Sequence, residues 1–355
     1  MIIREKAYPR AALIGNPSDG YFGKTIAFVF RNYNAEVTLY ESPSLEILPS
    51  VLDYNTYENM ADLTSSITKF GYYGGIRLLK ACVKTFYTYC MKEHIKLSDD
   101  NFTLRYQSNI PNRLGMAGSS AIITATMRAM IRFFQIEIPK PILANLVLSV
   151  ELDELGIKAG LQDRVAQAYE TPVYMDFNKE HMENFGYGIY EPIEIPDDLP
   201  LYIAYRTDLA EGSEILHSRL ALDYEAGVPE VHAAVREWAS LTDRVRDALA
   251  NHQYNLLPAL LDRNFDLRCE VCGSSVSEKN RRMVQIARQF GASAKFTGSG
   301  GAIIGTYRAD TFDDMRRELK KYDVEVIKPE IVRDGPEPHA LLNHLRAGRK
   351  DALAL

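Results

Sequence analysis

Residues 110–121, IPNRLGMAGSSA, combine glycines with two adjacent serines in a pattern that could bind phosphate. Aromatic and β-branched residues at 102–108 predict a strand before this loop, and apolar residues recurring every three or four positions predict a helix over residues 119–134 after it. This order directs free backbone N–H groups and the helix dipole at a bound phosphate. A serine hydroxyl there suits Mg²⁺, which prefers hard oxygen ligands. An ordinary helix cap made by Ser119 or Ser120 explains the same residues and stays open.

Two carboxylates follow at positions where acids need a partner or a function. Glu151 lies at the end of an apolar helical segment that opens near residues 139–141, and Asp163 begins the next helix beyond Gly160. Asp163 could accept a proton from a substrate hydroxyl, and Glu151 could hold a metal ion that bridges phosphates. The alternative is a surface acid and a helix cap, with Asp163 paired to the adjacent Arg164.

A third segment, KFTGSGG at residues 295–301, is rich in glycine between two expected strands. Glycine permits positive φ and close approach of the backbone to a ligand. A tight hairpin would have the same composition, so both interpretations remain. Neither a Walker loop nor GxGxxG is present: the GKT at residues 23–25 has Ser18 where the Walker pattern needs glycine.

Strands and helices alternate along the whole chain, which predicts an α+β protein. The expected strands include residues 10–15, 25–30, 35–40, 172–177 and the LYIAYR segment at 201–206. Long helices are expected at residues 74–91, 229–250, 256–270 and 278–290. The segment EPIEIPDDLP at residues 191–200 favours a domain boundary, giving domains over 1–190 and 191–332 and a loosely attached tail over 333–355.

Composition narrows the class of partner. With 355 residues, 46% of them hydrophobic, the chain is long enough for two domains with cores. A net charge of −6 and a pI of about 5.7 argue against a general binder of nucleic acid or anionic membranes. No apolar run reaches the about 20 residues that a membrane helix needs. The four cysteines, two of them in one CxxC without a second ligand pair, are expected to be reduced thiols in a cytoplasmic protein.

The order and separation of these segments resemble the GHMP kinases, the superfamily of galactokinase, homoserine kinase and mevalonate kinase. RAALIGNPSD at residues 10–19 is similar to their first motif, PNRLGMAGSSA to the second and KFTGSGG to the third. The resemblance implies an N-terminal ribosomal-protein-S5-like domain with a left-handed βαβ unit and a ferredoxin-like C-terminal domain. The site would lie in the cleft between them.

Further strings are similar to the glucuronokinase family within this superfamily. They include GNPSDGYFGKTI, GYYGGIRLL, NLVLSVELDELGIKAGLQDRVAQAY and NFDLR, and the similarity extends over residues 7–330. The second motif is one residue longer than the commoner PxxxGLGSSA, a form that the glucuronokinases share. Lys24 stands where the plant enzymes are expected to have arginine, which keeps the charge but loses the bidentate fork.

The resemblance also implies roles for residues of this chain. Asp163 would accept the proton of the acceptor hydroxyl, with Arg10 neutralising charge beside it. Glu151 and Ser120, with Ser119 as the alternative, would hold Mg²⁺. The phosphates of ATP would lie against Gly115, Met116, Ala117, Gly118, Ser119 and Ser120. The sugar would contact Asn16, Asp19, Lys24, Gly298, Ser299 and Gly300.

The expected function is therefore that of a sugar-1-kinase: transfer of phosphate from ATP to the anomeric hydroxyl of D-glucuronate, by a monomer or homodimer. Cations open to the substrate carboxylate are Lys24, Arg77 and Arg206. Two alternatives remain. One is a GHMP kinase for galacturonate, a neutral hexose, a heptose phosphate or a mevalonate-like acid, and the other is a catalytically silent sensor with the same fold.

Overall fold

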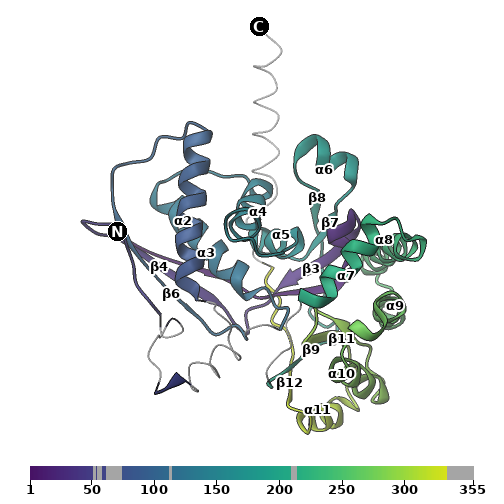
Figure 1. Ribbon diagram of the computed structural model, residues 1–355. Helices are drawn as coiled ribbons and strands as arrows, with labels where there is room; N and C mark the ends of the chain where they lie inside the picture. The colour runs from purple at the N-terminus through teal and green to yellow at the C-terminus, as the bar shows by residue number, and fades with distance from the viewer. Residues whose placement is uncertain (51–52, 54–57, 61–73, 112–113, 209–213, 334–355) are drawn as a thin grey trace.

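The computed structural model describes residues 1–50, 53, 58–60, 74–111, 114–208 and 214–333, which form three four-stranded sheets (Figure 1). The first sheet has the order β1 (Ile2–Ala7), β4 (Ala35–Glu41), β6 (Phe102–Ser108) and β5 (Glu46–Ile47). The second has the order β2 (Arg10–Ile14), β3 (Lys24–Val29), β7 (Val173–Asp176) and β8 (Ile189–Pro192). The third has the order β10 (Lys295–Phe296), β11 (Ala302–Thr306), β9 (Leu201–Arg206) and β12 (Val324–Ile327).

The helices described in the N-terminal half are α2 (Gly75–Lys92), α3 (Gly118–Phe133), α4 (Lys140–Ser149), α5 (Leu161–Tyr169) and α6 (Lys179–Phe185). Helix α3 packs on β1 and β4 because its apolar stripe, which includes Ile123 and Met127, is fully buried. Helix α4 continues into a π-helical turn (Val150–Glu154), and α5 packs on β3.

The third sheet belongs to the C-terminal half and has a ferredoxin-like topology. Strand β9 leads through α7 (Glu214–Glu225), α8 (Pro229–Ala250), α9 (Leu257–Cys272) and α10 (Glu278–Gln289) to the β10–β11 hairpin, and α11 (Phe312–Lys320) leads to β12. All neighbours in this sheet are antiparallel, and the first and third strands in chain order lie at its centre. Helix α8 also packs on β3, so it joins the two halves of the molecule (Figure 1).

Most of the expected elements are confirmed, with bounds shifted by one or two residues. Strands β1, β5 and β8 and the helices α6 and α7 had not been expected. The division expected at residue 191 falls inside β8, which pairs with β7, and the chain crosses to the third sheet over residues 193–200. Most of the expected C-terminal tail, residues 334–355, lies outside the described residues.

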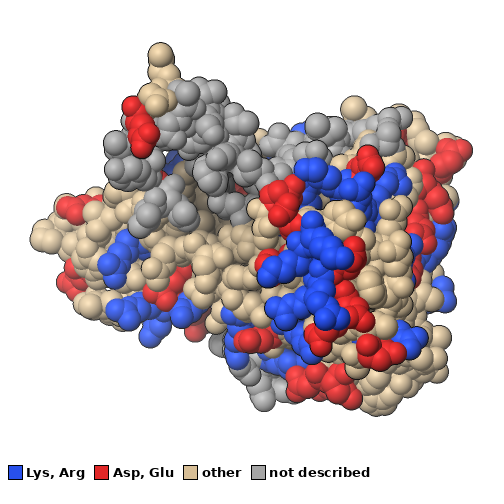
Figure 2. Space-filling view, turned by 90° about the horizontal axis from the view of Figure 1, so that it is seen from below, with Lys and Arg blue, Asp and Glu red and all other residues tan. Residues whose placement is uncertain are grey.

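The surface carries both signs of charge side by side. On the face in Figure 2, Lys and Arg side chains lie among Asp and Glu side chains. Within α10, for example, NH2 of Arg282 lies 3.4 Å from Oε1 of Glu278. Among the described residues no helix is both long and apolar enough to span a membrane. All four cysteines are free thiols.

Candidate active site

The three glycine-containing segments, which are far apart in the sequence, meet around β2. The backbone N–H of Arg10 donates to Met116 O at 3.0 Å, and that of Ala12 donates to Thr297 O at 2.9 Å. A Cβ atom placed on Gly298 would lie only 2.5 Å from Gly115 O. The second and third motifs therefore touch each other, and glycine is required at residue 298 by this approach. The third motif is both a hairpin loop, between β10 and β11, and part of the site.

The N-terminus of α3 has no side-chain cap among the described residues. Its N-cap residue is Ala117, which adopts φ 62° and offers no side-chain oxygen to the first N–H groups. The hydroxyl of Ser119 donates to Glu151 Oε1 at 2.7 Å, and that of Ser120 donates back to Ala117 O at 3.1 Å. The interpretation of either serine as an ordinary N-cap is therefore wrong. From α5, Gln167 Nε2 donates to the same Ala117 carbonyl at 3.0 Å and anchors the loop.

Asp163 lies in the first turn of α5 with arginines on both of its oxygens. Arg10 Nε donates to Asp163 Oδ1 at 2.8 Å, and Arg164 donates through NH1 to Oδ2 at 3.1 Å. A second nitrogen of Arg10 donates to Thr297 O, which ties this arginine to the third motif. The structure thus joins Asp163 to Arg10 and to its neighbour Arg164, so the pairing offered as an alternative is also present.

Glu151 projects from the π-helical turn after α4 and is only 2% exposed. Its Oε2 accepts a hydrogen bond from Arg164, so one arginine bridges Glu151 and Asp163. Such π-turns are frequent at functional sites because they redirect a side chain within a helix. Glu151 Oε1 and the hydroxyl of Ser119 form a pair of hard oxygen donors beside the N-terminus of α3, and this donor set fits Mg²⁺. The hydroxyl of Ser120 is fully buried and points at the backbone instead.

Asp19 faces this cluster from the short 3₁₀ helix after β2 (Ser18–Tyr21). A Cβ atom on Gly160 would lie 2.8 Å from Asp19 Oδ2, so the backbone before α5 runs directly against this carboxylate. Burial, and then the negative charge of Asp163, raise the pKa of Asp19 to about 6. Asp19 is therefore within the same electrostatic site as the acid at the start of α5.

Asn16 lies at the site, but both ends of its side-chain amide are already hydrogen-bonded within the protein. Its Nδ2 donates to Phe296 O at 3.3 Å and to Gly298 O at 3.1 Å, and its Oδ1 accepts from the ammonium of Lys295. Lys295 is fully buried, and desolvation together with nearby arginines holds its pKa well below the usual range. Asn16 thus positions the third motif, which differs from the direct sugar contact that was expected of it.

The three cations expected to be open to a substrate carboxylate are arranged differently. Lys24 Nζ lies 2.9 Å from Asp243 Oδ2 and 3.4 Å from Asp176 Oδ2. Burial lowers the pKa of Lys24, but hydrogen bonds with Asp243 and Tyr174 more than offset it and raise the pKa above its usual value. Both ends of the Arg206 fork bind Asp208, at 2.7 and 2.8 Å, and Arg77 is exposed on α2. The contacts of Lys24 and Arg206 do not favour a role in binding the carboxylate.

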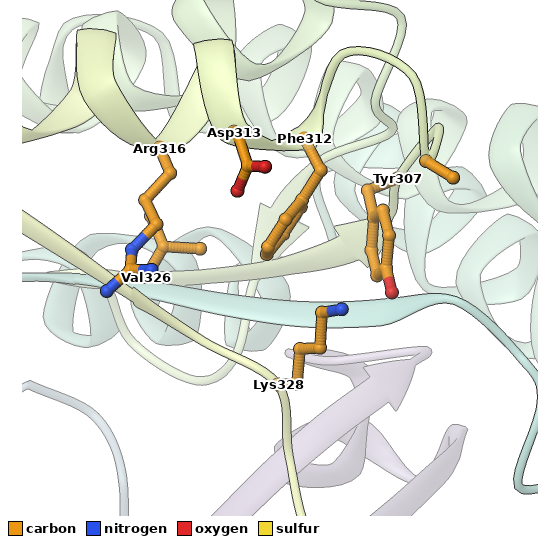
Figure 3. Close-up of a pocket in the computed structure, with 7 residues that line it drawn as sticks. Tyr307, Phe312, Asp313, Arg316, Val326 and Lys328 are labelled. Atoms are coloured by element: carbon orange, nitrogen blue, oxygen red, sulfur yellow. The ribbon is translucent and has the colours of Figure 1, made fainter.

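A separate cavity of about 390 Å³ lies in the C-terminal half, between α11 and β12 (Figure 3). Lys328 Nζ lies 4.9 Å from the ring centroid of Phe312 and 5.1 Å from that of Tyr307. The cavity shares no lining residue with the three glycine-containing segments or with Asp163 and Glu151. The chemistry expected from the sequence is therefore located elsewhere.

Comparison of this chain with known proteins identifies its family. The family model of the GHMP kinases N terminal domain matches residues 77–171, and that of the GHMP kinases C terminal domain matches residues 245–324. Glucuronokinase 1 of Arabidopsis thaliana is 40% identical over 306 residues, which cover 85% of this chain and 84% of the relative. The chain belongs to the GHMP kinases. The resemblance of its motifs and the expected two-domain fold are confirmed.

Two further comparisons give a second plant relative of this GHMP kinase and a solved structure with the same fold. Probable glucuronokinase 2 of Arabidopsis thaliana is 40% identical over 308 residues, with 85% of this chain and 84% of the relative covered. Among solved structures, Lactococcus lactis galactokinase complexed with galactose shares the fold with a TM-score of 0.69 at 16% identity, covering 94% of each chain. The reaction of this GHMP kinase is ATP-dependent phosphoryl transfer.

Sequence reasoning missed several residues that build the site. Arg164 was considered only as a neighbour of Asp163, whereas it also binds Glu151. Gln167 lies one helical turn beyond Arg164 on α5, and this i, i+3 spacing could have indicated a shared face. Lys295 carried no local signal, because a lysine next to a strand ordinarily points to water. Asn112 and Arg113, within the second motif, lie outside the described residues.

Proposed function

We propose that this protein is a glucuronokinase, which transfers the γ-phosphoryl group of ATP to the anomeric hydroxyl of D-glucuronate. The identity with the plant glucuronokinases over most of the chain supports this substrate. The observation that carries the chemistry is the placement of Asp163 between Arg10 and Arg164. The backbone N–H of Arg10 binds Met116 O in the second motif, and Arg164 binds Glu151, which also accepts from Ser119 in the first turn of α3. The proposed base is in this way connected to the proposed phosphate site.

Asp163 acts on the acceptor hydroxyl. The hydroxyl oxygen forms a bond to the γ-phosphorus as the bond from that phosphorus to the bridging oxygen of ADP breaks, and the hydroxyl proton passes to a carboxylate oxygen of Asp163. Arg10 places positive charge beside the transferring group and holds the orientation of Asp163. Because the transition state is stabilised mainly by positioning and charge, this pair supplies what the protein must contribute.

The phosphates bind at the second motif in this proposal. Residues 115–120 and the first N–H groups of α3 donate to phosphate oxygens, and the αL backbone of Ala117 sets the direction of those donors. Ser119 and Glu151 hold Mg²⁺, in place of the Ser120 and Glu151 pair expected from sequence. When bound, Mg²⁺ neutralises charge that develops on the nucleotide phosphates.

Asp19 and the third motif form the sugar end of the site. With a pKa of about 6, Asp19 is mostly ionised at neutral pH and accepts hydrogen bonds from sugar hydroxyls. Gly298, Ser299 and Gly300 form the wall against Gly115, and Asn16 fixes their position. Lys24 is not part of this proposal, since two carboxylates already surround its ammonium.

The function is tested by coupled ADP release with Mg·ATP and a panel of glucuronate, galacturonate, galactose, glucose, mevalonate and homoserine. We expect turnover of roughly 1 to 100 per second on glucuronate, and phosphorus NMR should show an anomeric phosphate. Turnover restricted to another compound would refute glucuronate as the substrate. Silence on every compound would instead favour a ligand sensor.

The role of Asp163 is tested by Asp163→Asn, with Asp310→Asn on the exposed surface as the matched control. We expect kcat to fall by about 10³-fold, in the range that general bases contribute, while ATP affinity is retained. The control should behave as the native protein does. More than a tenth of the native activity in Asp163→Asn would exclude this residue as the base.

A further inference from the structure

Arg268 is a buried cation without a carboxylate partner. It lies on α9, is 3% exposed, and forms no ion pair with the described residues. Its NH1 donates to Gly298 O at 3.0 Å and its NH2 to Ser299 O at 3.3 Å. Its Nε has no hydrogen-bond partner among the described residues. A guanidinium has five N–H donors, so the two bonds leave most of its capacity unused.

This arrangement is costly for a protein unless an anion completes it. Removing a charged group from water carries a penalty that neutral carbonyl acceptors offset only in part. The cost is visible in the burial of Arg268, which lowers the pKa of its guanidinium. Arg288, in the same half of the chain, is paired with both Asp262 and Asp266. Arg268 is more deeply buried than Arg288 and has no such carboxylate among the described residues.

The position of Arg268 connects it to the sugar end of the site. The two carbonyls that it binds belong to the third motif, at the residues that face Gly115 and Arg10. Arg268 therefore lies directly behind the backbone of the third motif, which forms the wall of the site against Gly115.

We propose that Arg268 is the residue that binds the carboxylate of a sugar-acid substrate. The inference rests on the proposed function, and it names the group that selects a sugar acid over a neutral sugar. In glucuronate the carboxylate is attached to C5, across the ring oxygen from the anomeric carbon. A sugar whose anomeric hydroxyl is at Asp163 thus directs its carboxylate away from that base, and Arg268 supplies the missing positive charge. The bound carboxylate in turn is the counterion that the buried guanidinium lacks.

The test compares D-glucuronate with D-glucuronamide, in which a neutral amide of nearly the same shape replaces the carboxylate. Native enzyme is expected to prefer glucuronate by about 100-fold or more in kcat/KM, as for a buried hydrogen-bonded charge pair. In Arg268→Gln the preference should fall to less than about fivefold, because only the charged substrate loses its partner. Arg268→Lys, which keeps the charge but loses the fork, should retain an intermediate preference.

Two control variants make the result specific. Arg308→Gln changes an exposed arginine of the same domain and should keep the native preference. Lys24→Gln should also keep it, since the Lys24 ammonium is bound by Asp243. If Arg268→Gln is poorly folded in thermal melting, Arg268→Lys provides the measurement.

Three outcomes would overturn the proposal. A parallel loss on both substrates, with the preference unchanged, would show that Arg268 only fixes the third motif. A collapse of the preference in Lys24→Gln would assign the carboxylate to Lys24. If native enzyme turns over neither compound, the proposed function itself fails. This outcome is distinguishable from a failure of the role of Arg268, because it is seen in the native enzyme without any variant.

Discussion

The two adjacent serines of the second motif allow a sharp test of the metal site. Ser119 donates its hydroxyl to Glu151 Oε1 at 2.7 Å, whereas the fully buried Ser120 donates to Ala117 O at 3.1 Å. Replacing either serine with alanine removes one hydroxyl from the same loop. The two variants therefore differ only in which bond is lost.

The expected magnitudes follow from those bonds. Each variant loses one hydrogen bond, worth about 1 to 2 kcal/mol, so both should melt a few degrees below the native protein. Ser119→Ala also removes a proposed ligand of Mg²⁺. Losing a group that supports a metal ligand typically weakens metal binding by about 10- to 100-fold. We expect the apparent Mg²⁺ affinity of Ser119→Ala to fall by at least that factor. Ser120→Ala should keep the native Mg²⁺ dependence.

The assay is ADP release at saturating sugar and fixed ATP, titrated with free Mg²⁺, with thermal melting of both variants alongside. A rightward shift for Ser119→Ala alone is the expected result. If Ser120→Ala requires more Mg²⁺ and Ser119→Ala does not, the metal is held by Ser120 as expected from sequence, and the reasoning from side-chain direction is wrong.

Three further predictions concern charge and close packing. Asp19 binds its proton more tightly in the folded chain, with a pKa of about 6 against 3.8, so its contribution to stability falls as the pH rises through this window. In thermal melts, Asp19→Asn should be more stable than the native protein by on the order of 2 kcal/mol at pH 7.5, and equally stable below about pH 4. If the variant and the native protein melt at the same temperature at both pH values, this reasoning is wrong. Gly298→Ala places a Cβ 2.5 Å from a backbone oxygen of the facing loop and should lower kcat/KM by about 100-fold, whereas Gly20→Ala, with no atom within 4 Å of its Cβ, should not. Arg164→Met leaves Glu151 buried without its ion pair and should lower the free energy of unfolding by about 3 to 5 kcal/mol, measured by chemical denaturation. Adding Glu151→Gln should restore much of this lost stability. An unchanged denaturation midpoint in the single variant would refute the pairing.

The local sequence pattern was sufficient to predict helices that bury one face along their length. The apolar periodicity of α3 and of α8 predicts those helices closely, because one face of each is buried along its whole length. It failed for β1, whose residues Ile2–Ala7 include three charged side chains on an edge strand. It also failed for β8, which has no fully buried residue. In β1 only Ile3 and Ala7 are buried, so neither strand has the run of alternating apolar residues by which a strand is predicted.

The sequence by itself determined the family, and it predicted the phosphate-binding loop and the acids of the site, since these depend on residue types at short range and in a given order. Tertiary structure decided which groups act together. Arg10 reaches Asp163 across 153 positions, and Lys295 reaches Asn16 across 279. It also decided which of two adjacent serines faces Glu151, because neighbouring residues of a helix point in different directions. Among the described residues, Arg268 forms no ion pair, whereas the ammonium of Lys24 lies close to two carboxylates. The charge environment of a side chain depends on neighbours that only the folded chain supplies.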